Sequence, residues 1–145
     1  MKPVELTMTR TFAATPDKLW QAWTTEQGLA SWWWHTWPDT RYSIDATPGG
    51  RYRIDASDHG IGVRGEFLEV TPPHRLVFSW IWVDDGVDGD TERVTVTFTP
   101  DGAGTRLDLL HTGPWTTPEP VESYRQGWDF VFDALSGTTQ RAAAG

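Results

Sequence analysis

The chain opens with alternating apolar and polar residues and then changes to helical spacing. Residues 4–12 carry apolar side chains mainly at even positions, which predicts a first strand. Thr15 is typical of a helix N-cap and Pro16 of the first helical position, so a helix should begin there. A second short helix is predicted over residues 26–34. The apolar residues at helical spacing are Leu19, Trp20 and Trp23 in the first helix and Leu29, Trp32 and Trp33 in the second.

A period of two dominates the middle of the chain, from about residue 41 to 111. Alternating runs are separated by turn sequences such as Pro48-Gly49-Gly50 and Pro72-Pro73, which predicts about six antiparallel strands. Residues 76–83 are mostly apolar on both faces, so that strand should be central and buried on both sides. Residues 84–90 are mainly acidic and glycine and are interpreted as a polar hairpin loop.

Helical spacing returns near the end of the chain. A long helix is predicted from about Pro118 to Gln140, with Phe130 off its apolar stripe. The stripe consists of Tyr124, Trp128, Val131, Phe132 and Leu135. Because strands and helices segregate along the chain, the class is α+β, and the long helix has to cover the apolar face of the sheet. Whether the space between them is filled or hollow depends on side-chain volumes that the pattern does not settle.

Composition narrows the class of protein. The 145 residues fit one domain spanning 1–145, and a formal net charge of −8 disfavours nucleic acid and anionic membranes as partners. The longest apolar run, residues 76–83, is far too short to span a bilayer, and no cysteine is present. We therefore expect a soluble cytoplasmic protein without disulfides.

Tryptophan is the unusual component, with 10 residues. Indoles fill cores, but they also line pockets for flat apolar ligands. The inner face of the central strand, the end of the last strand and the helical stripe supply the candidate ligand-binding residues. They are Phe78, Trp80, Trp82, His111, Trp115, Tyr124, Trp128 and Phe132. A solid aromatic core is the competing interpretation, since burial alone stabilises each such side chain by about 1.5–3 kcal/mol.

Polar residues on the predicted sheet leave two questions open. His111 shares the inner face with Leu107 and Leu109, so it is either a core histidine bonded to backbone or a group that binds or protonates a ligand. Arg51 and Arg53 face solvent if the tyrosine between them points inward, and enter the cavity in the opposite register. The solvent-facing register is favoured, because a buried arginine needs a partner.

Sequence motifs of catalysis and metal binding are absent. The chain has no G-x-S-x-G elbow, no phosphate-binding P-loop and no G-x-G-x-x-G. Its histidines lack paired metal-ligand spacing, and the acidic segment 84–90 departs from the calcium-loop pattern, since Gly86 falls where a ligand should be. We expect neither a metal nor a cofactor.

Several short motifs, taken in order, resemble a known superfamily. They are residues 16–24, residues 29–33 with their paired tryptophans, residues 48–53 with a glycine pair, residues 65–80, and Gly127-Trp128. In order and spacing these are similar to the START-like, or SRPBCC, superfamily that includes birch-pollen allergens. Within it, the chain resembles single-domain relatives of the C-terminal domain of the activator of heat-shock protein 90 ATPase.

The resemblance spans roughly residues 9–139 and implies a fold and a function. The fold is a helix grip, a curved antiparallel sheet of about seven strands wrapped around a long C-terminal helix, with two short helices after the first strand. The function it implies is binding of a small hydrophobic molecule between sheet and helix, without covalent chemistry.

Two alternatives follow from the same resemblance. One is an enzyme of the polyketide cyclase or aromatase kind, with His111, Arg53 or Tyr124 as its polar groups; the nearly all-apolar inner face argues against it. The other is a co-chaperone-like partner of heat-shock protein 90, contacting it through an exposed aromatic patch. That patch, which would also offer a homodimer surface, consists of Trp32, Trp33, Trp34 and Trp37.

Overall fold

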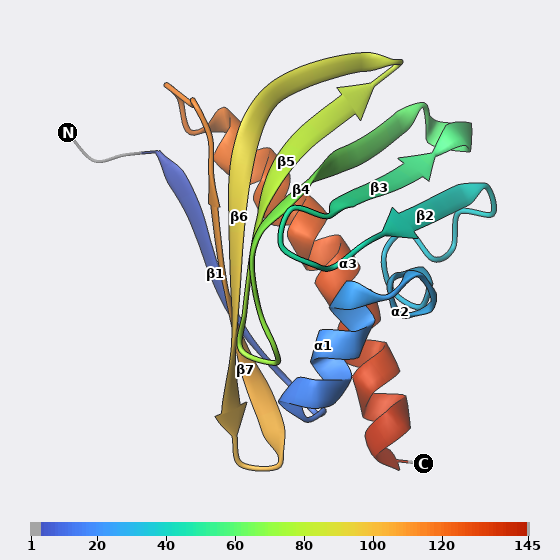
Figure 1. Cartoon of the computed structure of the whole chain (residues 1–145), viewed down its shortest axis with the longest axis vertical. Coiled ribbons are helices and arrows are strands. Elements are labelled where there is room, and N and C mark those ends of the chain that lie inside the picture. Colours follow the sequence, from blue (N-terminus) through green and yellow to red (C-terminus); the bar gives the residue numbers. More distant parts are fainter. Residues whose placement is uncertain (1–3, 145) are drawn as a thin grey trace.

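The computed structural model describes residues 4–144, with side chains described up to residue 139. The described residues form one seven-stranded antiparallel sheet in the order β1-β7-β6-β5-β4-β3-β2. The strands bend around a long helix, confirming the predicted α+β helix-grip fold (Figure 1). The elements are β1 Glu5–Phe12, α1 Pro16–Thr24, α2 Glu26–Ala30, β2 Thr40–Ile44, β3 Arg51–Ala56, the 3₁₀ turn η1 Ser57–His59, β4 Ile61–Thr71, β5 Arg75–Asp84, β6 Val87–Asp101, β7 Gly104–Thr112 and α3 Glu119–Ala144.

The first helix begins where the capping residues predict. The Thr15 side chain accepts a hydrogen bond from the backbone N–H of Lys18 at 3.4 Å, and Pro16 is the first residue of α1. The α2 helix is capped by Thr25 in the same way and ends at Ala30, so the prediction of a helix through residue 34 is wrong.

The segment after α2 folds as turns, and this changes the directions in which its tryptophan side chains point. A helix points consecutive side chains 100° apart, so it could not direct neighbouring indoles into one core. The turns can: Trp32, Trp33 and Trp34 are 0%, 4% and 8% exposed, and Trp37 is half-buried. The predicted exposed aromatic patch is therefore wrong, and the dimer surface expected from it is lost as well.

The β5 strand lies fourth among the seven and is central, as its apolar faces predict. The hairpin that leaves it is tighter than predicted. Asp84 pairs with Val87, and Asp85 and Gly86 form a two-residue turn with positive φ angles of 52° and 78°. Asp-Gly is a preferred sequence for such a turn, so β6 begins at Val87, and most of the predicted loop 84–90 is strand.

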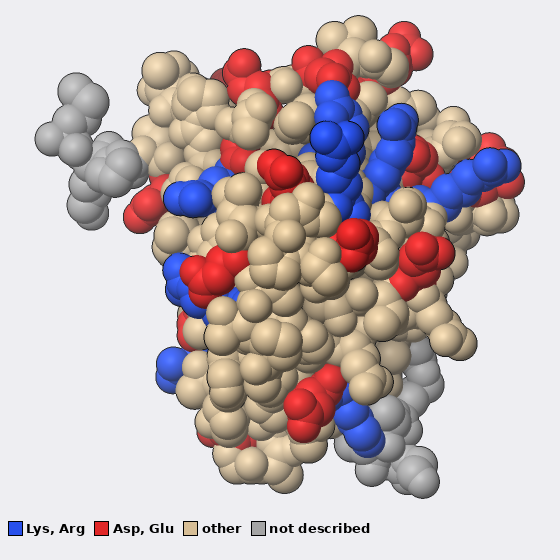
Figure 2. Space-filling view, viewed as in Figure 1, with Lys and Arg blue, Asp and Glu red and all other residues tan. Residues whose placement is uncertain are grey.

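The outer face of the sheet carries many of the charged side chains. Tyr52 is 6% exposed and points inward, so Arg51 and Arg53 face solvent, as the favoured register predicts. Arg53 pairs with Asp55 at 2.6 Å, and Arg64 on the neighbouring strand pairs with Asp88. Figure 2 shows positive side chains gathered over this part of the sheet, interspersed with acidic ones.

The α3 helix buries its predicted stripe against the sheet. Trp128, Val131, Phe132 and Leu135 are at most 3% exposed, whereas Phe130, off the stripe, is 47% exposed. The helix contacts the edge strand β1, and α1 packs on β6 and β7. In the described part of the chain, no helix combines the length and the apolar character needed to cross a membrane.

Candidate functional site

The interior between sheet and helix is filled at one end and hollow at the other. Around Trp23, Tyr52 and Phe78 the remaining void is only about 20 Å³, so this half is a close-packed core. Beside the first half of α3 there is a pocket of about 370 Å³. Its volume falls within the range of small-molecule sites, about 300–1,000 Å³.

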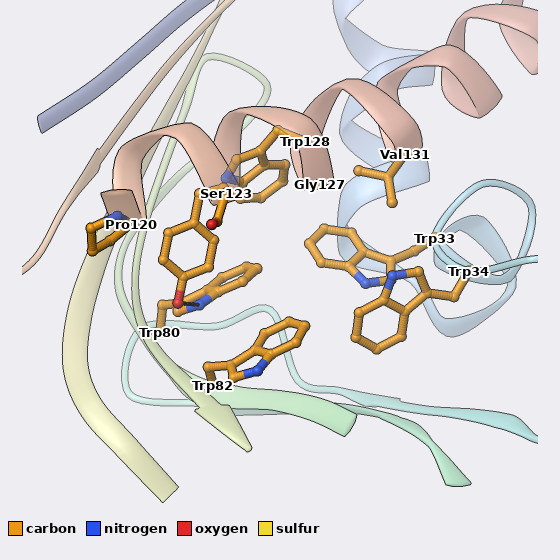
Figure 3. A pocket seen from close by; sticks show the side chains of 10 residues that line it. Trp33, Trp34, Trp80, Trp82, Pro120, Ser123, Gly127, Trp128 and Val131 are labelled. Carbon is orange, nitrogen blue, oxygen red and sulfur yellow. Dashed lines mark hydrogen bonds between the residues drawn. The ribbon is translucent and has the colours of Figure 1, made fainter. Parts of the chain in front are cut away.

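Aromatic faces form most of the pocket wall, as Figure 3 shows. On the sheet side, Trp80 and Trp82 of β5 have nearly parallel rings, 13° apart with centroids separated by 6.4 Å. Across from them lie Trp33 and Trp34, from the turns after α2. The complete lining is Trp33, Trp34, Trp80, Trp82, Pro120, Ser123, Tyr124, Gly127, Trp128 and Val131.

Local structure explains how these residues converge. Trp80 and Trp82 are two apart on a strand and so share its inner face. The α3 residues of the lining are spaced by one, three or four positions, which places them on one side of a helix. Gly127 contributes by lacking a side chain: a Cβ built there would meet no atom within 4 Å. Ser123 and Gly127 are exposed, so the pocket opens beside them.

A buried hydrogen-bonded network lies behind the pocket and is centred on His111. His111 is 0% exposed, and its Nδ1 accepts the indole N–H of Trp128 at 3.1 Å. Its Nε2 lies 2.8 Å from the carboxylate of Glu92. Because an indole nitrogen only donates, Nδ1 carries no proton and Nε2–H donates to Glu92. Burial lowers the pKa of His111, and the Glu92 carboxylate offsets this in part.

Glu92 links His111 to Trp115 by a hydrogen bond and also lies beside Tyr124. Its second carboxylate oxygen accepts the indole N–H of Trp115 at 3.3 Å, and its side chain is only 9% exposed. The hydroxyl of Tyr124 accepts the indole N–H of Trp80 at 3.3 Å. Burial raises the pKa of Tyr124, and the nearby Glu92 carboxylate raises it further. The network thereby holds Trp80 and Trp128, two of the pocket walls, in fixed orientations.

The predicted ligand-binding residues divide between the pocket and its surroundings. Trp80, Trp82, Tyr124 and Trp128 line the pocket. The other four do not: Phe78 borders the small void, Phe132 is core, and His111 and Trp115 belong to the network behind the wall. The interpretation of His111 as bonded to backbone is wrong, because its partners are the side chains of Glu92 and Trp128.

Sequence reasoning missed Glu92 and the role of the turn tryptophans. Glu92 continues by one step the buried alternation of Val94, Val96 and Phe98 on β6, which is a signal that could have placed it inward. Trp33 and Trp34 carried no such signal, because their directions depend on turns. Trp34 has a φ of 51°, a left-handed conformation that bulky residues rarely adopt.

The wall of the pocket is mostly aromatic, and its titratable groups are few. Among the described residues there is no group of three or more His, Cys, Asp or Glu that is placed to hold a metal ion. Of the titratable groups in the network, the Tyr124 hydroxyl belongs to a pocket-lining residue, while both ring nitrogens of the fully buried His111 already have partners. Flat apolar contact is therefore the main property that the wall offers to a ligand.

Comparisons with known proteins agree with this architecture. A sheet gripping a long helix with a pocket between them defines a START-like helix-grip domain. The family model described as "Activator of Hsp90 ATPase homolog 1-like protein" matches residues 13–140, so the chain belongs to this family. The comparison with curated proteins gives no match.

Solved structures with the same fold come from varied sources. MLL2253 from Mesorhizobium loti is 25% identical with a TM-score of 0.79, covering 94% of this chain and 97% of its own. PFC0360w, an Hsp90 activator from Plasmodium falciparum, is 23% identical with a TM-score of 0.71, covering 91% and 93%. DynU16, from the dynemicin biosynthetic locus, is 24% identical with a TM-score of 0.78; the match covers 93% of this chain but only 46% of DynU16. The last two likenesses support the fold alone.

Gly127 gives a first prediction about stability. Gly127→Ala should raise the free energy of unfolding by about 0.5–1 kcal/mol, because alanine favours the helix and its Cβ meets open space. Urea unfolding followed by circular dichroism measures this. Gly28→Ala is the contrasting control, since a Cβ there would lie 2.3 Å from the carbonyl oxygen of Gln21 and should destabilise the protein. A loss of stability in Gly127→Ala would contradict the geometry described for α3.

Proposed function

We propose that the protein binds a small, flat, apolar molecule in the pocket between β5 and α3, without covalent chemistry. The observation that carries the proposal is the localised hollow of about 370 Å³ in an interior that is otherwise closely packed. Aromatic side chains usually fill space; here they enclose it. Membership of the family is consistent with this use, although a fold does not by itself define a ligand.

The direct test uses N-phenyl-1-naphthylamine, a neutral aromatic probe whose fluorescence rises in apolar surroundings. The native protein should bind the probe with a saturable rise in probe fluorescence, and the bound probe should quench the emission of the tryptophans. Gly127→Leu should weaken binding at least about tenfold, because the new side chain occupies the pocket. Native mass spectrometry of freshly purified protein gives a second readout, a retained small molecule.

A matched control separates blocking from unfolding. Gln126→Leu adds a similar apolar side chain at the neighbouring exposed helix position, outside the pocket lining, and should leave probe binding unchanged. Saturable binding that is equal in the native protein and in Gly127→Leu would show that the probe sits elsewhere. No saturable binding by the native protein would count directly against the proposal.

Partnership with heat-shock protein 90 is a second candidate, supported by the family description and by the Plasmodium activator of the same fold. The surface first expected to make that contact is buried, so any contact would have to involve other residues. A cyclase-like enzyme is supported less. Of the polar groups expected for it, Arg53 faces solvent, His111 is bonded to Glu92 behind the pocket wall, and the hydroxyl of Tyr124 accepts the indole N–H of Trp80. A pull-down with purified heat-shock protein 90 tests whether the two proteins bind each other.

A further inference from the structure

The outer face of the sheet, on the side away from α3 and the pocket, carries a broad depression. A hollow of about 790 Å³ spans β2 to β6, and a second of about 410 Å³ adjoins it toward β7. Leu68, Ser79 and Thr91 line both, so the two form one continuous surface, which we call the outer depression. Four arginines line it, although the chain as a whole carries a formal net charge of −8. They are Arg51, Arg53, Arg64 and Arg93.

Strand pairing brings two of the arginines together at some cost to folding. Arg53 on β3 lies directly opposite Arg64 on β4, and like charges in that position destabilise a sheet. Two neighbouring carboxylates offset this cost. Nε of Arg53 donates a hydrogen bond to Asp55, and a terminal nitrogen of Arg64 donates one to Asp88. Because a guanidinium has five N–H donors, both arginines keep donors for a further partner.

The other two arginines have no carboxylate partner within the part of the chain that the structure describes. Arg51 and Arg93 are both exposed, and neither forms an ion pair with Glu66, although Glu66 lies opposite Arg51 on β4. Glu92 also borders the outer depression, but its carboxylate is bonded to His111 on the inner side of the sheet. Basic side chains therefore outnumber the acidic ones available here, even with the two neighbouring aspartates counted, which is the reverse of the chain as a whole. Figure 2 shows basic side chains gathered over this part of the sheet.

An exposed apolar side chain lies where the two hollows meet. The register of β4 against β5 shifts between Phe67 and Glu69, so Leu68 is the extra residue of a β-bulge. Phe67 is buried, whereas Leu68 is 46% exposed and lines the outer depression together with the partly exposed Ile81. An apolar centre with arginines around it is the composition typical of a protein–protein interface.

We infer that the outer depression binds a short, extended, acidic segment of a partner protein, with carboxylates on the arginines and an apolar side chain on Leu68. Neighbouring strands lie about 4.8 Å apart, so the arginines of β3 and β6 are separated by about 14 Å. One small anion cannot reach both, whereas carboxylates spaced along an extended chain, at about 3.3 Å per residue, can. A nucleic acid longer than the depression would run onto the acidic remainder of the surface. A short segment stays within it, where screening over about 8 Å lets the local arginines dominate.

The test measures, by fluorescence anisotropy, the binding of an end-capped peptide of about seven residues labelled with a neutral fluorophore. The peptide carries paired glutamates on both sides of a central leucine. The native protein should bind it saturably, and more weakly as salt is raised from about 50 to about 200 mM, because salt screens surface charges. A peptide with glutamine in place of each glutamate should bind at least about tenfold more weakly. Arg51→Gln combined with Arg93→Gln should weaken binding of the acidic peptide at least about fivefold, while every ion pair between described residues stays intact.

Matched variants separate the local surface from the overall charge. Arg75→Gln combined with Arg106→Gln removes equal charge from exposed positions outside the outer depression, so it should leave peptide binding unchanged. Leu68→Ser changes an exposed side chain and should weaken binding about threefold without lowering stability. An equal loss in the two arginine pairs, no saturable binding by the native protein at low salt, or tighter binding of a single-stranded oligonucleotide of equal charge would overturn the inference. Probe binding in the pocket should be the same in all these variants, so this inference and the proposed function fail independently.

Discussion

Trp32→Ala should lower the free energy of unfolding by about 3–5 kcal/mol, the cost typical of removing a fully buried tryptophan. The side chain is 0% exposed and lies among other rings, with centroids 4.9 Å from Trp23 and 5.3 Å from Trp33. Its indole N–H donates to the carbonyl of Ala22 in α1 at 2.8 Å, so it also ties the turns after α2 to the first helix. Urea unfolding followed by circular dichroism measures the loss.

Two further variants separate the contributions to this loss. Phe130→Ala removes an aromatic side chain that is 47% exposed, and it should change stability by no more than about 0.5 kcal/mol. Trp32→Phe keeps a ring in the core but loses the bond to Ala22, so its stability should fall between those of the native protein and Trp32→Ala. A Trp32→Ala variant as stable as Phe130→Ala would contradict the burial described for the turns.

The fold was predictable because its signals are local and repeated. Alternation along the strands and the stripe on α3 each recur over many residues, so a few exceptions do not change the interpretation. The turn at Asp85-Gly86 shows the limit of composition: an acidic stretch suggested a loop, whereas the Asp-Gly pair specified a tight hairpin. Strand extent beyond a turn follows from backbone geometry more than from polarity.

The site was only partly predictable, because it depends on the shape of segments without periodicity. Strand and helix spacing brought Trp80, Trp82 and Trp128 to the pocket, but turns direct Trp33 and Trp34 there. Gly127 leaves space beside the pocket, and the lack of a side chain at one position gives no periodic signal in the sequence. A long helix over a curved sheet was therefore foreseeable, while the position of the space between them was not.

Glu92 shows how a polar group is kept inside a largely apolar interior. A buried carboxylate is costly unless donors surround it, and Glu92 has Nε2–H of His111 and the indole N–H of Trp115. His111 in turn accepts the N–H of Trp128, so protonation of the imidazole at Nδ1 would break this hydrogen bond to a residue of the pocket wall. The protonation state of His111 thus couples stability to the geometry of the site.

Acidification should destabilise the protein through His111. Burial lowers its pKa below the ordinary value of 6.5, and a second proton would have to displace the Trp128 N–H from Nδ1. The unfolded chain therefore binds more protons than the native protein as pH falls below about 6.5, and stability decreases through that window. One histidine contributes at most about 1.4 kcal/mol per pH unit. Unfolding free energies between about pH 7.5 and pH 5.5 measure the slope.

The contribution of His111 is isolated by difference. His111→Gln keeps a polar side chain that does not titrate, so it should lower stability at neutral pH but flatten its decrease toward pH of about 5.5. His74→Gln removes a histidine at an exposed position and should preserve the native slope. Every carboxylate keeps its surroundings in all three proteins except Glu92, which loses its His111 partner in His111→Gln. Identical slopes in the native protein and His111→Gln would show that the imidazole takes up its proton in the folded state as readily as in the unfolded chain.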